Sequence, residues 1–333
     1  MALLVNAKLV EDLLKMKDAI ELMEQAFVEW GSGGVTMPLR HVIEVTPGRD
    51  YCGFMPAYLQ GMGALGLKVV TLFKDNPTSF RLPSILATSV LLDERTGRTK
   101  CIMDANYLTA VRTAAVSGVA TKHLGRPDAS VLGVVGSGVQ ATAHIRAVCE
   151  VRDIKEVRVY SPHLYQKWES FVQRIKDCSA DVITQARNAE EAVRLVDVVC
   201  VATTATTPVI NAQWLSPGVH LNVIGSHTPS AREVDTETVL ASRLVCESLS
   251  SCLKEAGDIV IPIEEGKLQR EDVQTELSDV VLGHKPGRLD ETDITLFKST
   301  GLAFEDVALM KLVYDRACET GEGVPFEFGD PHL

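Results

Sequence analysis

Residues 130–140 read Ser-Val-Leu-Gly-Val-Val-Gly-Ser-Gly-Val-Gln, and this stretch decides the fold. The apolar and small residues 131–135 are typical of a buried parallel strand, and 139–148 are expected to continue as a helix. Between them, Gly136 permits a tight turn and Gly138 lets the backbone approach a ligand closely. Strand, glycine turn and helix in this order predict a dinucleotide site, with the pyrophosphate at the helix N-terminus. A purely structural turn is the alternative.

The composition is that of a soluble globular protein. A length of 333 residues allows roughly two domains, and 46% hydrophobic with 23% charged residues leaves ample material for a core. The formal net charge of −11 argues against nucleic acid or an anionic membrane as a partner. It does not exclude an anionic substrate, because a local basic cluster can act inside an acidic protein.

The eight cysteines form no C-x-x-C pair and no His/Cys cluster at metal-ligand spacing. We therefore expect no metal, and a reduced, cytoplasmic setting in which several cysteines are small core residues. The apolar run 1–5 is too short for a signal peptide. No stretch approaches the ~20 apolar residues of a membrane span.

The chain divides into two patterns on either side of the glycine turn. Before it, a helix over 17–30 and a helix over 106–123 flank short strands in a largely antiparallel sheet, at 39–45, 51–55, 65–73, 85–92 and 99–103. From 130 to 248, strands and helices alternate, as in a doubly wound parallel sheet. The tail from about 294 is expected to be helical. The fold class is thus α/β: a Rossmann-type doubly wound parallel sheet plus a second, α+β domain.

The second strand of the parallel sheet bears on the choice of cofactor. An NAD-binding domain usually ends this strand in Asp or Glu, which binds the ribose hydroxyls. Here the strand 157–160 is followed by Ser161, Pro162 and His163, with no carboxylate. Ser161 and His163, with Lys167 on the following turn, could instead hold a 2′-phosphate. NADP(H) is therefore favoured and NAD(H) is possible; alternatively, these residues are only a strand end and a helix start.

Three basic residues stand in apolar surroundings of the first domain. Lys68 interrupts an apolar strand, Arg112 stands among alanines and valine, and Arg40 follows Met37-Pro38-Leu39. A cation in such a setting is costly unless an anion meets it. Together they favour a substrate that bears a carboxylate. The alternative is an internal salt bridge, or a side chain that reaches back to water.

The loop 225–229, Gly-Ser-His-Thr-Pro, follows a strand of the parallel sheet. Ligands of doubly wound sheets bind at the carboxyl ends of the strands. His227 is therefore a candidate proton donor or cofactor contact. A loop histidine without such a role is an equal alternative.

At several of these residues the chain resembles the ornithine cyclodeaminase/mu-crystallin family. The matching motifs follow the family order over nearly the whole chain: Met37-Pro38-x-Arg40, Met55-Pro56-Ala57, Gly66-Leu67-Lys68, Asp104-Ala105, Leu108–Ala115, Gly136–Ala141, Glu255–Asp258 and Phe297–Asp306. The family includes cyclodeaminases, alanine dehydrogenases, cyclic ketimine reductases and a vertebrate lens and thyroid-hormone-binding branch.

The resemblance implies a domain organisation and a set of roles. Residues 1–117 and 299–333 would form a substrate-binding and dimerisation domain, 118–298 the Rossmann domain, and the protein would be a homodimer. The basic residues would hold the substrate carboxylate and polarise the imine, and Thr113 and the segment 299–300 would lie near the cofactor.

One departure from the family separates its activities. Cyclodeaminases and archaeal alanine dehydrogenases carry an aspartate where this chain has His227. With the acid also missing after the second strand, the hypothesis becomes an NAD(P)H-dependent reductase of cyclic ketimine acids. It would convert Δ1-pyrroline-2-carboxylate to L-proline, with the piperideine homologue, which gives L-pipecolate, discriminated only weakly. The rivals are an ornithine cyclodeaminase or alanine dehydrogenase, and a protein that binds NADPH without turnover.

The candidate residues fall into catalytic, substrate-binding and cofactor-binding sets. Lys68 and Arg112 are the expected catalytic residues. The substrate site is expected to comprise Arg40, Met55, Lys68, Arg112 and His227. The cofactor site is expected to comprise Thr113, Gly136, Ser137, Gly138, Val139, Gln140, Ser161, His163, Lys167, Thr203, Gly225 and Ser299.

Overall fold

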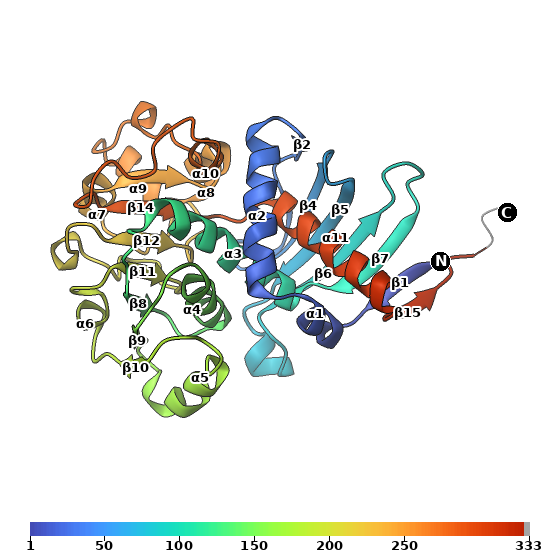
Figure 1. Cartoon of the computed structure of the whole chain (residues 1–333), viewed down its shortest axis with the longest axis horizontal. Helices are drawn as coiled ribbons and strands as arrows, with labels where there is room; N and C mark the ends of the chain where they lie inside the picture. Colours follow the sequence, from blue (N-terminus) through green and yellow to red (C-terminus); the bar gives the residue numbers. More distant parts are fainter. Residues whose placement is uncertain (330–333) are drawn as a thin grey trace. The chain divides into compact units, whose positions relative to one another are not determined.

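The computed structural model describes residues 1–329, which form two compact units (Figure 1). Unit 1 consists of Met1–Arg112 with the C-terminal segment that begins at Leu302, and unit 2 is Thr113–Gly301. The observed divisions therefore lie a few residues before 117 and a few residues after 298. The first of them falls inside one helix, α3 (Asn106–Leu124), which no sequence signal of a linker marks.

Unit 1 is built on an eight-stranded sheet. Its order is β15-β1-β7-β6-β5-β4-β2, with β3 also paired to β4, and every pair is antiparallel except β1 with β7. The strands are β1 (Ala2–Val5), β2 (Val35–Thr36), β3 (His41–Thr46), β4 (Asp50–Leu59), β5 (Ala64–Leu72), β6 (Ile85–Leu92), β7 (Thr99–Asp104) and β15 (Val324–Phe326).

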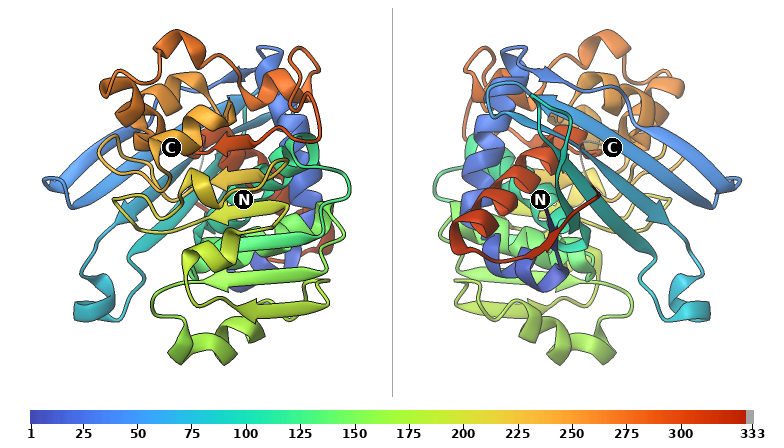
Figure 2. Two further views of the ribbon diagram at one scale, coloured as in Figure 1. Left: turned by 90° about the vertical axis from the view of Figure 1, so that its left-hand side faces the viewer. Right: turned by 90° about the vertical axis from the view of Figure 1, so that its right-hand side faces the viewer.

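Helices cover one face of this sheet. They are α1 (Ala7–Leu13), α2 (Met16–Gly31) and α11 (Ala303–Thr320), while a single π-helical turn, η1 (Asn76–Phe80), joins β5 to β6. The right-hand view of Figure 2 shows α11 against the strands of unit 1. A Cβ at Gly66 of β5 would lie 2.6 Å from the carbonyl oxygen of Val90 on β6 and 2.9 Å from Cε of Met310 on α11, and the backbone contact leaves room only for glycine. Phe304 of α11 packs edge-on against Phe27 of α2, with 5.1 Å between ring centres.

Unit 2 contains a seven-stranded, wholly parallel sheet in the order β10-β9-β8-β11-β12-β14-β13, most of which can be followed in Figure 1. The chain runs outward from β8 in one direction and resumes on its other side at β11, which confirms the predicted Rossmann-type fold. The strands are β8 (Val131–Val135), β9 (Glu156–Tyr160), β10 (Val182–Gln185), β11 (Val198–Val201), β12 (His220–Val223), β13 (Arg243–Cys246) and β14 (Thr295–Lys298).

The connections of unit 2 are mostly short helices. They are α4 (Val139–Val151), α5 (Trp168–Arg174), α6 (Ala189–Val193), α7 (Thr236–Ala241), α8 (Leu249–Glu255), α9 (Gly257–Glu264) and α10 (Leu277–Val281), with 3₁₀ turns η2 (Tyr165–Lys167), η3 (Ala212–Trp214) and η4 (Arg270–Asp272). The expected helical tail from 294 is wrong at its start. Residues 295–298 form the buried strand β14, and the helix begins at Ala303.

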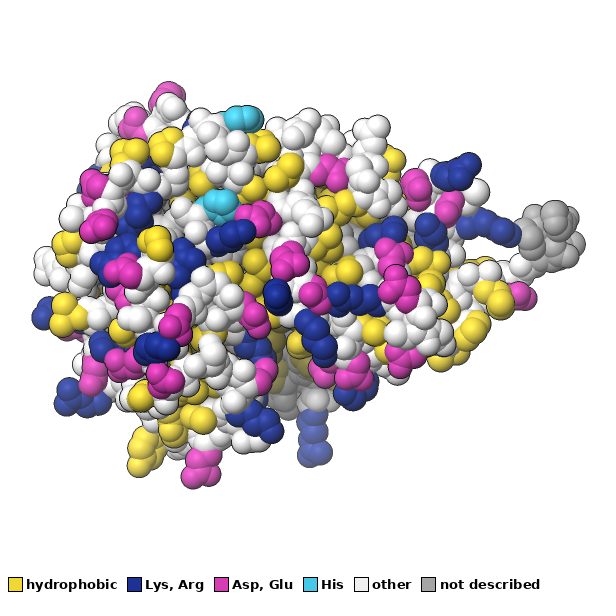
Figure 3. Space-filling view, in the orientation of Figure 1, with side chains coloured by type: hydrophobic (Ala, Val, Ile, Leu, Met, Phe, Trp, Pro, Cys, Tyr) yellow, Lys and Arg dark blue, Asp and Glu magenta, His cyan; other side chains and the backbone are white. Residues whose placement is uncertain are grey.

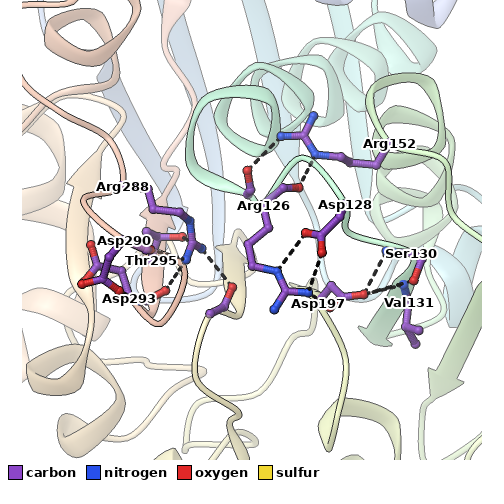
Figure 4. Close-up of polar contacts among 12 residues, drawn as sticks. Arg126, Asp128, Ser130, Val131, Arg152, Asp197, Arg288, Asp290, Asp293 and Thr295 are labelled. Atoms are coloured by element: carbon purple, nitrogen blue, oxygen red, sulfur yellow. Dashed lines mark hydrogen bonds and ion pairs between the residues drawn. The ribbon is translucent and has the colours of Figure 1, made fainter.

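Polar side chains fix the amino-terminal edge of the sheet in unit 2 (Figure 4). Asp197 accepts hydrogen bonds from the backbone N–H groups of Ser130 (2.8 Å) and Val131 (3.0 Å), and from Arg126. Arg152 donates to the carbonyls of Thr121 and three neighbouring residues at the end of α3. These arginine contacts satisfy the last carbonyls of a buried helix, which otherwise lack partners.

Acidic and basic side chains are interspersed over the face of the molecule shown in Figure 3. Among residues 1–329, no helix has both the length and the apolar character needed to span a bilayer. Nor does that part of the chain hold three or more His, Cys, Asp or Glu side chains grouped so that they could bind a metal ion.

Candidate functional site

The glycine turn between β8 and α4 has the geometry expected of an anion site. Gly136 has φ +126°, and a Cβ there would lie 2.3 Å from the carbonyl oxygen of Ala202, so only glycine fits. Its N–H donates to the carbonyl of Tyr160 at the end of β9, 2.8 Å away. The turn is therefore tied to both neighbouring strands at the point where the strand order reverses.

Gly138 opens α4, and the space beside it is clear. A Cβ at Gly138 would meet no atom of residues 1–329 within 4 Å, and no described side chain caps the helix. The first N–H groups of α4, including those of Val139 and Gln140, thus remain available to an anion. Ser137 lies between the glycines. The residues present fit a dinucleotide pyrophosphate.

The loops after β11, β12 and β14 carry Thr203, Gly225 and Ser299 at the carboxyl edge of the same sheet. Two buried glutamates that the sequence analysis did not single out hold these loops. Glu233 accepts hydrogen bonds from the N–H and the hydroxyl of Thr203, both at 2.7 Å, and from the N–H of Gly225 at 2.5 Å. Glu247 accepts from the Ser299 hydroxyl at 2.7 Å and from the N–H of Gly301 at 2.6 Å.

The end of β9 presents Ser161, half-buried, with His163 and Lys167 exposed beyond it. A further cation approaches the glycine turn from α5. Arg174 donates to the carbonyl of Ser137 at 2.9 Å, although 37 residues separate the two in sequence. The strand-end motif drew attention to 161–167, but no spacing rule would have found Arg174.

His227 lies on the exposed loop after β12, with Nδ1 3.3 Å from the carbonyl oxygen of Gly225. Thr113 is buried on α3, directly after Arg112 in the chain. The predicted residues therefore fall into two sets: Arg40, Met55, Lys68 and Arg112 belong to unit 1, and the rest belong to unit 2.

The three cations of unit 1 form one electrostatic cluster with two carboxylates of α11. Lys68 is 1% exposed, and its Nζ lies 2.6 Å from Oδ2 of Asp306. The Arg112 guanidinium pairs with Glu305 at 2.8 Å and lies 3.3 Å from Asp306. The internal salt bridges that were the alternative reading are thus present for Lys68 and Arg112.

Burial lowers the pKa of the Lys68 ammonium, Asp306 opposes this, and the positive charges of Arg112 and Arg40 add to the lowering; together they bring the pKa to about 8. Arg40 lies on the chain between β2 and β3, close enough to Lys68 for its charge to contribute to this lowering. Among the five charged groups, three are positive and two are negative. A lysine of lowered pKa in a buried cluster is typical of a functional site.

Local structure explains how these side chains meet. Lys68 of β5 stands directly opposite Met55 of β4 in the strand register, and Met55 is buried. Glu305 and Asp306 lie in the first turn of α11, where the helix dipole favours negative charge. Because α11 packs on β4 and β5, its acidic first turn reaches the cations of the sheet.

A parallel sheet of this order with a glycine turn between its first strand and helix defines unit 2 as a Rossmann-type, dinucleotide-binding class of domain. The chain belongs to the ornithine cyclodeaminase/mu-crystallin family, whose family model matches residues 2–321. The resemblance seen in the sequence motifs is thereby confirmed.

Three relatives illustrate the range of the family. The chain is 35% identical to the Δ1-pyrroline-2-carboxylate reductase of Bacillus cereus, over 98% of this chain and 100% of that protein. It is 41% identical to the Δ1-pyrroline-2-carboxylate reductase of Thermococcus litoralis, solved in complex with NADH and L-proline, with a TM-score of 0.93 covering 97% of this chain and 100% of that chain. It is 34% identical to an archaeal alanine dehydrogenase dimer solved with bound NAD, with a TM-score of 0.91 covering 98% and 99% of the two chains. The predicted class of reductase is thus the one named for the first two relatives.

Proposed function

We propose that this protein is an NAD(P)H-dependent reductase of cyclic ketimine acids that converts Δ1-pyrroline-2-carboxylate to L-proline. The reductases of Bacillus cereus and Thermococcus litoralis, similar over nearly the full chain, support this reaction. The piperideine homologue, which gives L-pipecolate, differs by one methylene, so we expect it to be used as well.

The observation that carries the proposal is the cluster of buried Lys68 and Arg112 with half-buried Arg40. Its carboxylates, Glu305 and Asp306, hold the lysine and Arg112 in place by contacts of 2.6 and 2.8 Å. Because these cations are already fixed in position, they can bind the substrate carboxylate without rearranging. Positioning of this kind can supply several kcal/mol of the activation free energy.

The chemistry requires little more from the protein than this positioning. A reduced nicotinamide supplies a hydride, which forms the new C–H bond at the C=N carbon. The π electron pair of the C=N bond moves to the ring nitrogen, which is already protonated, and the product is a secondary amine. Lys68 and Arg112 hold the carboxylate beside this carbon and increase its electron deficiency. An iminium needs no additional strong acid, so the role that we assign to the cations is to bind and position the substrate.

A panel of substrates with both cofactors tests the proposal. The purified protein is mixed with Δ1-pyrroline-2-carboxylate, Δ1-piperideine-2-carboxylate, pyruvate with ammonia, or ornithine, and nicotinamide absorbance is followed with NADPH, NADH or the oxidised forms. We expect oxidation of the reduced cofactor with the two cyclic imines. Amination of pyruvate or formation of proline and ammonia from ornithine, without imine reduction, would overturn the proposal.

The preference for NADP(H) is part of the proposal. The end of β9 offers Ser161, His163 and Lys167 and no carboxylate, and Arg174 adds a cation beside the glycine turn. Positive and hydroxyl groups at this position favour a 2′-phosphate. NAD(H) is the alternative, and both structural relatives described above hold NAD or NADH.

We further propose that the protein is a homodimer formed through unit 1. The archaeal alanine dehydrogenase is a dimer. In the chain described here, Val42, Ile43 and Val45 of β3 are between 48% and 58% exposed, an apolar strand surface suited to burial against a second copy. The eight free cysteines support a reducing, cytoplasmic setting.

Alanine dehydrogenase is the second candidate function, favoured by 34% identity to the archaeal enzyme over nearly the full chain. His227 argues against it, because the family members with amine chemistry carry an aspartate at that place. A protein that holds NADPH without turnover is the remaining alternative. Cofactor binding with no oxidation by any imine in the panel would favour this last role.

A further inference from the structure

The side chain of Glu233, on the loop after β12, contacts two loops at the points where they leave the sheet. The loop after β11 reaches it through Thr203, and the loop after β12 reaches it through Gly225. The three donors use both carboxylate oxygens. A Cβ at Gly225 would lie 2.4 Å from Oε1 of Glu233, so this contact is as close as the backbone allows.

The setting of Glu233 is fully buried and highly charged. Its own N–H donates to Oδ1 of Asp258 on α9 at 2.6 Å, and Asp258 in turn pairs with Lys298 of β14 at 2.8 Å. All three side chains are 0% exposed. Burial raises the pKa of Glu233, Lys298 opposes this, and Asp258 adds to the rise; together they bring the pKa to about 7.

The hydrogen-bond donors around Glu233 account for a carboxylate at a position where burial disfavours its charge. Three donors that face one carboxylate can all be satisfied only if both oxygens accept, which requires the ionised form. The loops that Glu233 joins lie at the carboxyl edge of a parallel sheet, where open α/β sheets bind their ligands.

We propose that Glu233 is a positioning residue for the dinucleotide: its ionised carboxylate locks the loops after β11 and β12 in the conformation that receives the cofactor. The inference rests on the proposed function only in that the chain binds a dinucleotide. It does not depend on the identity of the imine. Protonation of Glu233 removes one acceptor and releases a loop.

The test compares Glu233→Gln with wild type by direct binding of NADH, whose pyrophosphate does not titrate between pH 6 and 8. The glutamine amide nitrogen cannot accept from an N–H donor, so one of the three hydrogen bonds is lost. We expect the NADH Kd of Glu233→Gln at pH 8 to rise about tenfold, the usual effect of losing a hydrogen bond to a charged group. The wild-type Kd should rise as the pH falls from 8 to 6, whereas that of the variant should stay flat.

Asp197→Asn is the matched control for stability. Asp197 also accepts from two backbone N–H groups and a side chain, but at the amino-terminal edge of the same sheet. Its amide variant should lower the melting temperature without changing the NADH Kd. Thr203→Val, which removes only the hydroxyl donor to Glu233, should weaken NADH binding in the same direction as Glu233→Gln.

Two results would overturn the inference. One is an unchanged NADH Kd in Glu233→Gln together with the same pH dependence as wild type. The other is an equal rise of Kd in Asp197→Asn, which would mean that general destabilisation explains both. If NADH binding depends on Glu233 but no cyclic imine is reduced, the positioning role stands and the proposed reaction fails.

Discussion

Lys68 and Asp306 lie 2.6 Å apart in the core of unit 1, although 238 residues separate them in the chain. One comes from the middle of β5 and the other from the first turn of α11. Removing either partner would leave a buried charge without its closest counterion, which typically costs several kcal/mol. The cluster therefore stabilises the fold as well as serving the binding role that we propose for it, and tests of that role must separate the two.

Lys68→Ala and Arg112→Ala should each lower kcat/KM for the cyclic imine by an amount equivalent to about 2–4 kcal/mol, because the bound substrate carboxylate loses one of the cations that hold it. Steady-state kinetics on folded protein, verified by circular dichroism, measures this. Lys311→Ala is the control, since it removes an ion pair of α11 with Asp315 that is partly exposed. Wild-type kinetics in Lys68→Ala would mean that the lysine serves only the fold.

The lowered pKa of Lys68, about 8, predicts an alkaline limit to substrate recognition. The ammonium binds a carboxylate only when protonated, so affinity should fall as the pH rises through about 8. The inhibition constant of pyrrole-2-carboxylate, a carboxylate that does not titrate between pH 7 and 10, reports this directly. Lys68→Arg keeps its charge over that range and should remove the limit. An identical pH profile in the two proteins would exclude Lys68 as the titrating group.

The cofactor preference can be tested at the end of β9. Ser161→Asp should favour NADH over NADPH, because a carboxylate repels a 2′-phosphate and accepts from ribose hydroxyls. The ratio of kcat/KM for the two cofactors is the measurement. Arg174→Ala should change the ratio in the same direction, since it removes a cation next to Ser137. A ratio unchanged by both substitutions would contradict the assignment of the 2′-phosphate site.

The two glycines of the turn should respond differently to alanine. Gly136→Ala forces a side chain into an unfavourable φ of +126° and against the Ala202 carbonyl, so it should lower the melting temperature. Gly138→Ala meets no described atom within 4 Å and should leave the melting temperature close to wild type. Its methyl group should nevertheless weaken dinucleotide binding, measured by NADH titration. Normal binding by Gly138→Ala would place the cofactor elsewhere.

Acid should destabilise the fold through a buried histidine. Burial lowers the pKa of His144 to about 4, while Nδ1 lies 2.7 Å from the Gln140 carbonyl and Nε2 3.0 Å from the Ser117 hydroxyl. Between pH 6.5 and 4 the unfolded chain binds a proton that the folded chain does not, so the free energy of unfolding decreases as the pH is lowered. The contribution is on the order of 3 kcal/mol at 1.36 kcal/mol per pKa unit. The free energy of unfolding, measured with denaturant and plotted against pH, should have a smaller slope in His144→Gln than in wild type over this range. Equal slopes in the two proteins would contradict the prediction.

Sequence reasoning succeeded where one short segment carries the whole signal. The strand, turn and helix around Gly136 are local, so the Rossmann-type sheet could be predicted from spacing alone. The cations were also visible, because Lys68 and Arg112 interrupt apolar runs. Their partners were not, since the meeting of Lys68 with Asp306 depends on how α11 packs on β5.

The features that the sequence does not predict also depend on residues that are distant in the chain. Glu233 lies in a polar loop, 30 residues from Thr203, and nothing in its neighbours marks it as buried. The apolar spacing of residues 295–298 continues into α11 and therefore predicts a helix. In the structure they are the buried strand β14, which takes its conformation from its neighbours β12 and β13. Pairings over long sequence separations override local preference.

The register of β4 against β5 has a consequence for folding fidelity. Met55 faces Lys68, and a slip by one residue would turn the lysine to the opposite face of the sheet, away from Asp306. A hairpin mispaired in this way would separate the Lys68 ammonium from the Asp306 carboxylate and leave each without its counterion. The correct register brings the two groups together. The contact to which we assign a role in substrate binding thus also favours the correct register of the sheet.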